Sequence, residues 1–150
     1  VHVHHVDELA QIEQQLLDHP TPVVFDHLGS VRGGEGVQAP GFQALMRLLA
    51  RDNCWAKLMG QYFVSAQFPH YPDIAPFARA MIKTAPDRIV WGTDWPHPNP
   101  APLPGKTSND PNEDYPIDDA LMLNQLPVWA PDAALREKIL VTNPARLYGF

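Results

Sequence analysis

The amino-acid sequence predicts an α/β fold in which parallel strands are joined by crossover helices. Four short β-rich runs alternate with helical patterns, and alternation of this kind is typical of α/β domains. Successive runs begin about 21, 32 and 34 residues apart, which leaves room for a helix between neighbouring parallel strands. The 150 residues, 45% of them hydrophobic, are enough for the buried core of one domain.

The strands and the helices between them can be placed in order along the chain. We expect strands at 1–5, 22–26, 54–58 and 88–91. Apolar residues at helical spacing follow the first three runs, and Asp7 is positioned to cap the first helix. These apolar sets are Leu9, Ile12 and Leu16, then Phe42, Leu45, Met46 and Leu49, then Ile74, Phe77, Ala78 and Met81.

The last third of the chain is expected to be helical after its strand. Two helices are predicted around 117–126 and 132–140. A final short helix follows, in which Asn143 suits the N-cap, Pro144 the first helical position and Gly149 the stop.

Two loops interrupt this order. Residues 29–41 carry five of the nine glycines, but no Gly-Lys-Ser/Thr follows, which argues against a phosphate-binding loop. Residues 95–116 carry seven of the seventeen prolines and cannot join a sheet. A long loop that follows a strand end is expected to cover a functional site.

Charge and composition exclude several classes of partner. The formal net charge of −6 disfavours binding to nucleic acid and to anionic membranes. No apolar run approaches the ~20 residues of a membrane span. Cys54 is the one cysteine, so no disulfide forms within the chain. We expect a cytoplasmic protein with a small-molecule ligand.

Polar side chains stand at the ends of all four predicted strands. In a parallel sheet these ends share one edge, so the side chains should converge there. They combine imidazole, carboxylate and ammonium groups, which is a set typical of hydrolases. The residues are His4 and His5, then Asp26 and His27, then Lys57, then Asp94.

Asp94 and the Asp26-His27 pair have the clearest chemical potential. A carboxylate between Trp91 and Trp95 would be partly desolvated and able to accept a proton or hold a cation. Alternatively, Asp94 braces the proline-rich turn. Asp26 either bonds to nearby backbone or orients His27, which would then polarise a carbonyl or bind a metal. The residues alone leave both alternatives open.

Other candidates have competing interpretations. His2 and His4 would share one face of a strand, where they either chelate a metal or lie on a solvated surface. Cys54 begins a strand at the opposite edge of the sheet, so we do not expect it to be a nucleophile.

Lys57 and His97 are candidates for contact with substrate. Lys57 either binds an anionic substrate or forms an ion pair with Asp94 or Asp26. His97 lies three residues beyond Asp94 and is placed to reach the same ligand.

Four segments taken together resemble a known family. They are 23–29 (VVFDHLG), 55–58 (WAKL), 89–97 (IVWGTDWPH) and 143–149 (NPARLYG). In this order they are similar to the C-terminal half of the amidohydrolase superfamily, within it most to the 2-pyrone-4,6-dicarboxylate lactonase-like metal-dependent hydrolases. The resemblance implies a TIM (β/α)₈ barrel of which this chain would hold strands five to eight. Residues 1–150 would then be a single partial domain, a fragment without its N-terminal half.

The resemblance also implies roles for individual residues. Asp94 matches a general base that takes a proton from the attacking water, and His27 matches a histidine that polarises the carbonyl. The family uses this chemistry either with a divalent metal, zinc or manganese, or without one. If a metal is bound, His27 and Asp94 are its candidate ligands. The family's first-strand His-x-His pair is missing, and we do not transfer its role to His2 and His4, which have the spacing but belong to another strand.

The substrate-binding pattern differs from the lactonase-like one. Two positions where that pattern has arginine hold Ser30 and Phe63, and Arg32 is the candidate replacement. A dicarboxylate lactone is therefore not assumed as the substrate. The expected substrate contacts are His4, Lys57, His97 and Arg32.

The expected function is hydrolysis of a lactone or a related cyclic ester or amide. One alternative is a metal-dependent decarboxylase of the same superfamily, and another is a catalytically silent half-barrel that serves as an assembly module. Half a barrel leaves sheet edges and apolar side chains uncovered. We therefore expect the isolated chain to self-associate, unless an N-terminal half covers these surfaces.

Overall fold

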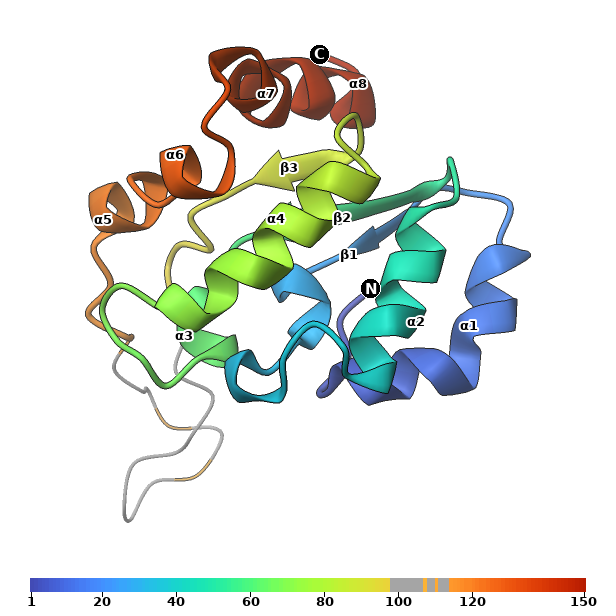
Figure 1. Cartoon of the computed structure of the whole chain (residues 1–150), viewed down its shortest axis with the longest axis horizontal. Coiled ribbons are helices and arrows are strands. Elements are labelled where there is room, and N and C mark those ends of the chain that lie inside the picture. Colours follow the sequence, from blue (N-terminus) through green and yellow to red (C-terminus); the bar gives the residue numbers. More distant parts are fainter. Residues whose placement is uncertain (98–106, 108–109, 111–113) are drawn as a thin grey trace.

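The computed structural model describes residues 1–97, 107, 110 and 114–150 and is built around three parallel strands. These strands are β1 (Val23–Phe25), β2 (Cys54–Leu58) and β3 (Ile89–Trp91), in the order β1-β2-β3. The crossover helices α2 (Pro40–Leu49) and α4 (Ala75–Thr84) lie on the same face of the sheet (Figure 1). The predicted parallel α/β fold is thus confirmed.

Shorter elements complete the described part of the chain. Helix α1 (Leu9–Leu17) packs beside α2, and α7 and α8 lie beyond β3 (Figure 1). The other helices are α3 (Gln61–Val64), α5 (Asp119–Leu123), α6 (Leu126–Trp129), α7 (Ala133–Glu137) and α8 (Asn143–Tyr148), with a π-helical turn η5 (Lys138–Thr142). Single 3₁₀ turns are η1 (Val6–Glu8), η3 (Gly33–Glu35) and η4 (Pro72–Ile74). The turn η2 (His27–Ser30) is left-handed, because all four of its residues have positive φ.

The prediction of a strand at 1–5 is wrong. Only Val1 pairs with the edge of β1: its amino group donates to the Val24 carbonyl, and its own carbonyl accepts from the Asp26 N–H at 3.0 Å. Further along, the Ser30 hydroxyl donates to the Val3 carbonyl at 2.6 Å. Beyond Val1 the segment no longer pairs with β1, and a side chain takes the Val3 carbonyl that a strand ladder would need.

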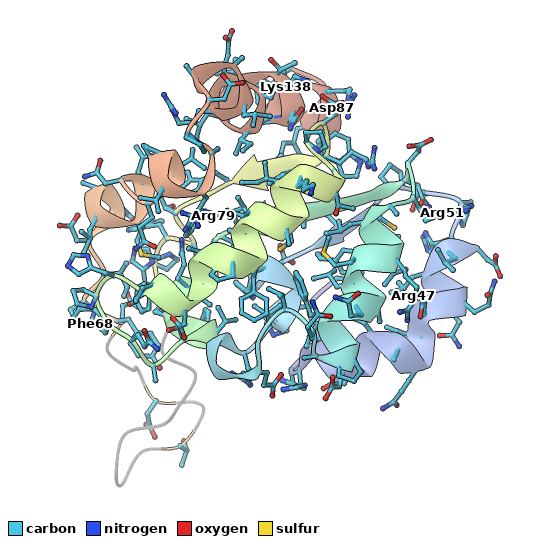
Figure 2. All side chains as sticks on the ribbon, in the orientation of Figure 1. Arg47, Arg51, Phe68, Arg79, Asp87 and Lys138 are labelled. Atoms are coloured by element: carbon cyan, nitrogen blue, oxygen red, sulfur yellow. The ribbon has the colours of Figure 1, made fainter. Side chains whose placement is uncertain are left out.

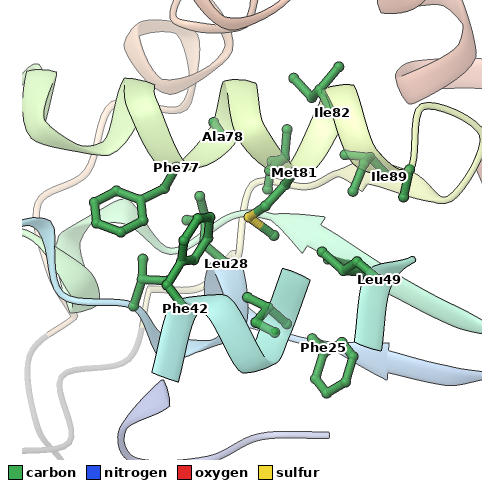
Figure 3. Close-up of a cluster of buried hydrophobic side chains, with 14 of the residues drawn as sticks. Phe25, Leu28, Phe42, Leu49, Phe77, Ala78, Met81, Ile82 and Ile89 are labelled. Atoms are coloured by element: carbon green, nitrogen blue, oxygen red, sulfur yellow. The ribbon is translucent and has the colours of Figure 1, made fainter. Parts of the chain in front are cut away.

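The hydrophobic core lies between the sheet and the helices α2 and α4. Figure 3 shows the Phe42 and Phe77 side chains from these helices meeting above Leu28, with Met81 beside them. The two phenyl rings pack edge to face with centroids 4.9 Å apart. The predicted apolar stripes are therefore the buried faces of these helices.

Two predicted helix caps differ from the structure. Asp7 does not cap α1, because the 3₁₀ turn η1 precedes that helix. His5 caps this turn, and its ring accepts from the Asp7 N–H at 3.2 Å. Asn143 does not cap α8, because its side chain is buried and donates to the carbonyls of Pro86 and Ile89 at 2.9 and 2.8 Å. Gly149 does end α8, with a φ of 76°.

The predicted helix at 117–126 is divided in two. α5 ends at Leu123, and α6 starts at Leu126 with a proline in its first turn. Proline suits the first turn of a helix because it lacks a backbone N–H. The predicted helix at 132–140 begins as expected, with the Asp132 carboxylate accepting from the Ala134 N–H at 2.9 Å, but it continues as the π-helical turn.

The predicted covering loop at 95–116 lies largely outside the described residues. In the part of the chain that is described, no helix combines the length and the apolar character needed to cross a bilayer.

Candidate active site

His27 and Asp94 face each other at the carboxyl ends of the strands. His27 follows β1 and Asp94 follows β3, so the two side chains meet across the end of the central strand β2. His27 Nε2 lies 3.2 Å from Asp94 Oδ1, and the side chains are only 14% and 12% exposed. The shared strand end that the sequence predicts is therefore where two candidate residues, 67 positions apart, come together.

Both residues adopt an uncommon backbone conformation. His27 has a φ of 47° and Asp94 a φ of 68°, in the left-handed region that residues with a Cβ rarely adopt. Such conformations persist only where the surrounding structure holds them, and they are concentrated at functional sites. The turns after β1 and β3 therefore direct these two side chains toward each other.

Tyr62 binds the other oxygen of the Asp94 carboxylate. Its hydroxyl donates to Asp94 Oδ2 at 2.7 Å. Burial favours a higher pKa for Asp94, but the hydrogen bonds from His27 and Tyr62 outweigh it and leave that pKa below the ordinary aspartate value. Asp94 is therefore held as a carboxylate.

The shielding of Asp94 comes from a different source than the sequence indicates. Trp95 does not cover the carboxylate, because its side chain is among the most exposed, at 75%. His27 and Tyr62 contact the carboxylate instead, and the backbone of Gly60 approaches it closely.

His2 joins the site from the N-terminal segment. Its Nδ1 lies 3.0 Å from Nδ1 of His27, with the two rings nearly perpendicular. One of these nitrogens must donate and the other accept. If neutral His27 donates from Nε2 toward Asp94, its Nδ1 accepts from His2, and the proton on Nε2 is the one available to a ligand.

A pocket opens beside these side chains. Arg32 is fixed at its wall, because Nη1 donates to the Phe63 carbonyl at 3.0 Å and Nη2 to the His4 carbonyl at 3.2 Å. The structure therefore brings Arg32 and His4 to the same pocket as His27 and Asp94. The lining residues are His2, Val3, His4, His27, Ser30, Arg32, Phe63, Val64 and Asp94.

Two expected substrate contacts lie outside this pocket lining. Lys57 Nζ forms an ion pair with Asp26 Oδ1 at 2.7 Å, one of the alternatives open from sequence. Burial lowers the pKa of Lys57, but the hydrogen bond and charge of Asp26 outweigh it and raise that pKa above its ordinary value. His97 is buried, with Nε2 3.1 Å from Asp119 Oδ1.

Sequence reasoning did not select Tyr62, and it weighed His2 only as part of a His-x-His pair. The available signal for Tyr62 was its place just beyond a strand end, after Met59 and Gly60. Nothing in the residue pattern distinguishes this tyrosine from one that packs in the core. The signal for His2 was its closeness to His4 in the sequence.

The described residues do not make up a complete metal site by themselves. No three His, Cys, Asp or Glu side chains in the described ranges are grouped so as to hold a metal. Catalytic zinc sites use three protein ligands, whereas His27 and Asp94 supply two. No catalytic step is therefore derived through a metal.

A comparison of the whole sequence with known proteins identifies the family. The sequence profile described as "Amidohydrolase" matches residues 1–150, and the chain belongs to this family. It is 42% identical over 132 residues to a 4-sulfomuconolactone hydrolase of Rhizobium radiobacter, and 36% identical over 138 residues to a 2-pyrone-4,6-dicarboxylate hydrolase of Comamonas testosteroni. The matches cover 86% of this chain in both cases, and 40% and 41% of these relatives.

A solved structure gives the same result for the fold. A protein of Agrobacterium tumefaciens, crystallised in its apo form, superposes with a TM-score of 0.80 at 35% sequence identity. The superposition covers all of this chain and 49% of that protein. The chain therefore spans about half the length of this structure and about two fifths of the curated relatives.

Proposed function

We propose that this chain contributes to the active site of a lactone hydrolase in which Asp94 is the general base and His27 polarises the ester carbonyl. The observation that carries the proposal is the pairing of His27 Nε2 with Asp94 Oδ1, 3.2 Å apart at the mouth of a pocket. The relatives named as hydrolases of 4-sulfomuconolactone and 2-pyrone-4,6-dicarboxylate support lactone hydrolysis as the reaction. We also propose that the three strands belong to the C-terminal half of a TIM barrel.

The reaction follows from what these two groups can donate and accept. A lactone and a water molecule that enter the pocket replace the His27–Asp94 hydrogen bond with bonds to the reacting atoms. Asp94 takes a proton from the water while the oxygen of that water bonds to the carbonyl carbon. His27 donates a hydrogen bond from Nε2 to the carbonyl oxygen as negative charge develops there. The ring C–O bond then breaks, and the leaving oxygen takes the proton from Asp94. The product is the open-chain hydroxy acid.

The pocket wall divides the remaining candidates into two groups. Arg32 and His4 line the pocket, and we assign them contact with polar groups of the substrate. Two carbonyls already fix the Arg32 guanidinium, so little side-chain entropy is lost when its remaining N–H groups bind an acceptor. Lys57 and His97 each hold a carboxylate outside the pocket, and we assign them to the support of the strand ends.

The test is the substitution Asp94→Asn in the intact protein. It keeps the size of the side chain but removes the basic carboxylate. We expect kcat for hydrolysis of 4-sulfomuconolactone or 2-pyrone-4,6-dicarboxylate to fall by about 10²- to 10⁴-fold, the usual contribution of a general base. Asp18→Asn is the matched control, because Asp18 lies on α1's exposed end and its side chain bonds to Gln14.

Product analysis completes the test. Unchanged turnover in Asp94→Asn would remove this residue from the chemistry. Release of carbon dioxide in place of a ring-opened acid would identify a decarboxylase instead.

A further inference from the structure

We propose that Tyr62 is a positioning residue for the proposed reaction: its hydroxyl fixes the orientation of the Asp94 carboxylate so that Oδ1 remains directed toward His27. The catalytic part of this inference rests on the proposed function. The structural part, that Tyr62 orients Asp94, can be tested without any turnover.

The two carboxylate oxygens of Asp94 have separate partners. The Tyr62 hydroxyl donates to Oδ2 at 2.7 Å, and His27 Nε2 lies 3.2 Å from Oδ1. Two partners on different oxygens fix the plane of the carboxylate, whereas a single partner leaves it free to rotate about the Cβ–Cγ bond. Hydrogen bonds to a charged group are also the stronger class. Tyr62 therefore determines which oxygen faces His27 and the pocket.

Tyr62 acts from behind the site. It is absent from the residues that line the pocket, although its neighbour Phe63 is among them. The Tyr62 hydroxyl is thus directed at Asp94, away from the space that a substrate would fill. Its removal should affect the chemical step and leave substrate binding unchanged.

Aromatic rings around Tyr62 keep its hydroxyl in place. The centroid of the Tyr62 ring lies 4.4 Å from that of Phe63, 5.1 Å from that of Tyr115 and 5.7 Å from that of His97. Burial and the nearby Asp94 carboxylate raise the pKa of Tyr62 well above the ordinary tyrosine value. The phenol is therefore protonated across the neutral range and serves as a donor, not as a second base.

The experiment compares Tyr62→Phe with wild-type protein, in the intact chain. This substitution deletes the hydroxyl and keeps the packed ring. We expect kcat for lactone hydrolysis to fall about tenfold with KM unchanged, the size of effect that loss of one hydrogen bond to a charged group produces. Tyr71→Phe is the matched control, because it removes a buried hydroxyl that has no hydrogen-bond partner among the described residues.

A second readout follows Asp94 directly. The carboxyl carbon of Asp94, labelled with ¹³C and assigned by its absence in Asp94→Asn, should change its NMR shift in Tyr62→Phe and stay constant in Tyr71→Phe. In a variant whose other resonances stay in place, a shift of this one reports the loss of the hydrogen bond at Asp94 and not a change in folding. If Tyr62→Phe does not fold, 3-fluorotyrosine at position 62 strengthens the donor and should also shift the resonance.

Each outcome decides the proposal. An Asp94 resonance that is the same with and without the hydroxyl overturns it, whatever the turnover. A shifted resonance with unchanged kcat overturns the catalytic part, and a shifted resonance with reduced kcat and constant KM supports the whole. If wild-type protein hydrolyses no lactone, the proposed function fails, while the resonance still reports whether Tyr62 orients Asp94.

Discussion

Gly60 connects β2 to the short helix that carries Tyr62, and a side chain at this position would be crowded. Its φ of 66° lies in the left-handed region. A Cβ built on it would lie 2.7 Å from Cδ2 of His27 and 3.0 Å from Oδ2 of Asp94. The missing side chain therefore makes room for the two proposed catalytic side chains to meet.

We predict that Gly60→Ala damages both stability and activity. The left-handed backbone costs a residue with a Cβ roughly 1–2 kcal/mol, and the clash displaces His27 or Asp94. Chemical denaturation should show this loss of unfolding free energy, and kcat should fall by about tenfold or more, since small misplacements of reacting groups are costly.

Gly149→Ala separates the two effects. Gly149 has a similar φ of 76°, but a Cβ there would meet nothing within 4 Å. This variant should show the backbone cost without loss of turnover. Equal activity in the two variants would contradict the view that Gly60 makes room for the site.

At the residue scale, the sequence predicts the groups that chemistry requires but not the groups that hold them. His27 and Asp94 could be selected because each follows a predicted strand at the edge where parallel strands end together, and because both match motifs of the family that the chain resembles. Tyr62 could not, because its contact with Asp94 depends on the turn at Gly60, which determines the direction of the next helix. His2 reaches His27 because its segment leaves the sheet, and no local pattern predicts this.

At the element scale, the buried side chain of Asn143 joins the start of α8 to β3. Its amide donates to the carbonyl of Pro86, which precedes β3, and to that of Ile89, within it. An ion pair between Lys138 and Asp87, both labelled in Figure 2, joins the same two parts of the fold at 2.7 Å. The position of β3, and hence of Asp94, depends on these contacts.

We predict that Asn143→Ala destabilises the protein by about 2 kcal/mol, because one buried and one partly buried carbonyl lose their donor. Urea denaturation measures this change. Asn124→Ala is the control, since Asn124 is exposed on the surface. A loss no greater than that of the control would show that the two hydrogen bonds contribute nothing net.

The elements that pattern alone could predict are those with a single buried face. The apolar stripes of α2 and α4 pack on one side of the sheet, so helical periodicity describes them well. The segment 1–5 has the composition of a strand but loses its carbonyls to side chains of Ser30 and Arg32 from later in the chain. Competition of this kind arises from tertiary structure and leaves no trace in local sequence.

At the scale of the whole molecule, strand order explains why the site could be anticipated. With β2 in the centre, the ends of β1 and β3 lie on either side of it, and the turns after them direct His27 and Asp94 across the gap. Parallel strands place their carboxyl ends at one edge, so polar residues after different strands can meet there, as His27 and Asp94 do, although Lys57 lies outside the pocket lining.

The same sheet leaves surfaces that need a partner. The outer edge of β1 is paired with Val1 alone, and within the described residues no strand pairs with the outer edge of β3. Large apolar side chains are also exposed, among them Phe150 at 83% and Phe68 at 63%. Open edges and exposed apolar side chains both promote association.

We therefore predict that the 150-residue chain, produced alone, forms dimers or larger assemblies. Sedimentation velocity over a range of concentrations should show an average mass that rises with concentration.

If exposed apolar side chains drive this association, the double variant Phe68→Ser, Phe150→Ser should shift the equilibrium toward monomer. If the open sheet edges drive it, that variant should associate like the wild type, because neither residue belongs to a strand. A folded monomer at every concentration would show that the helices already cover the edges well enough for the chain to exist alone.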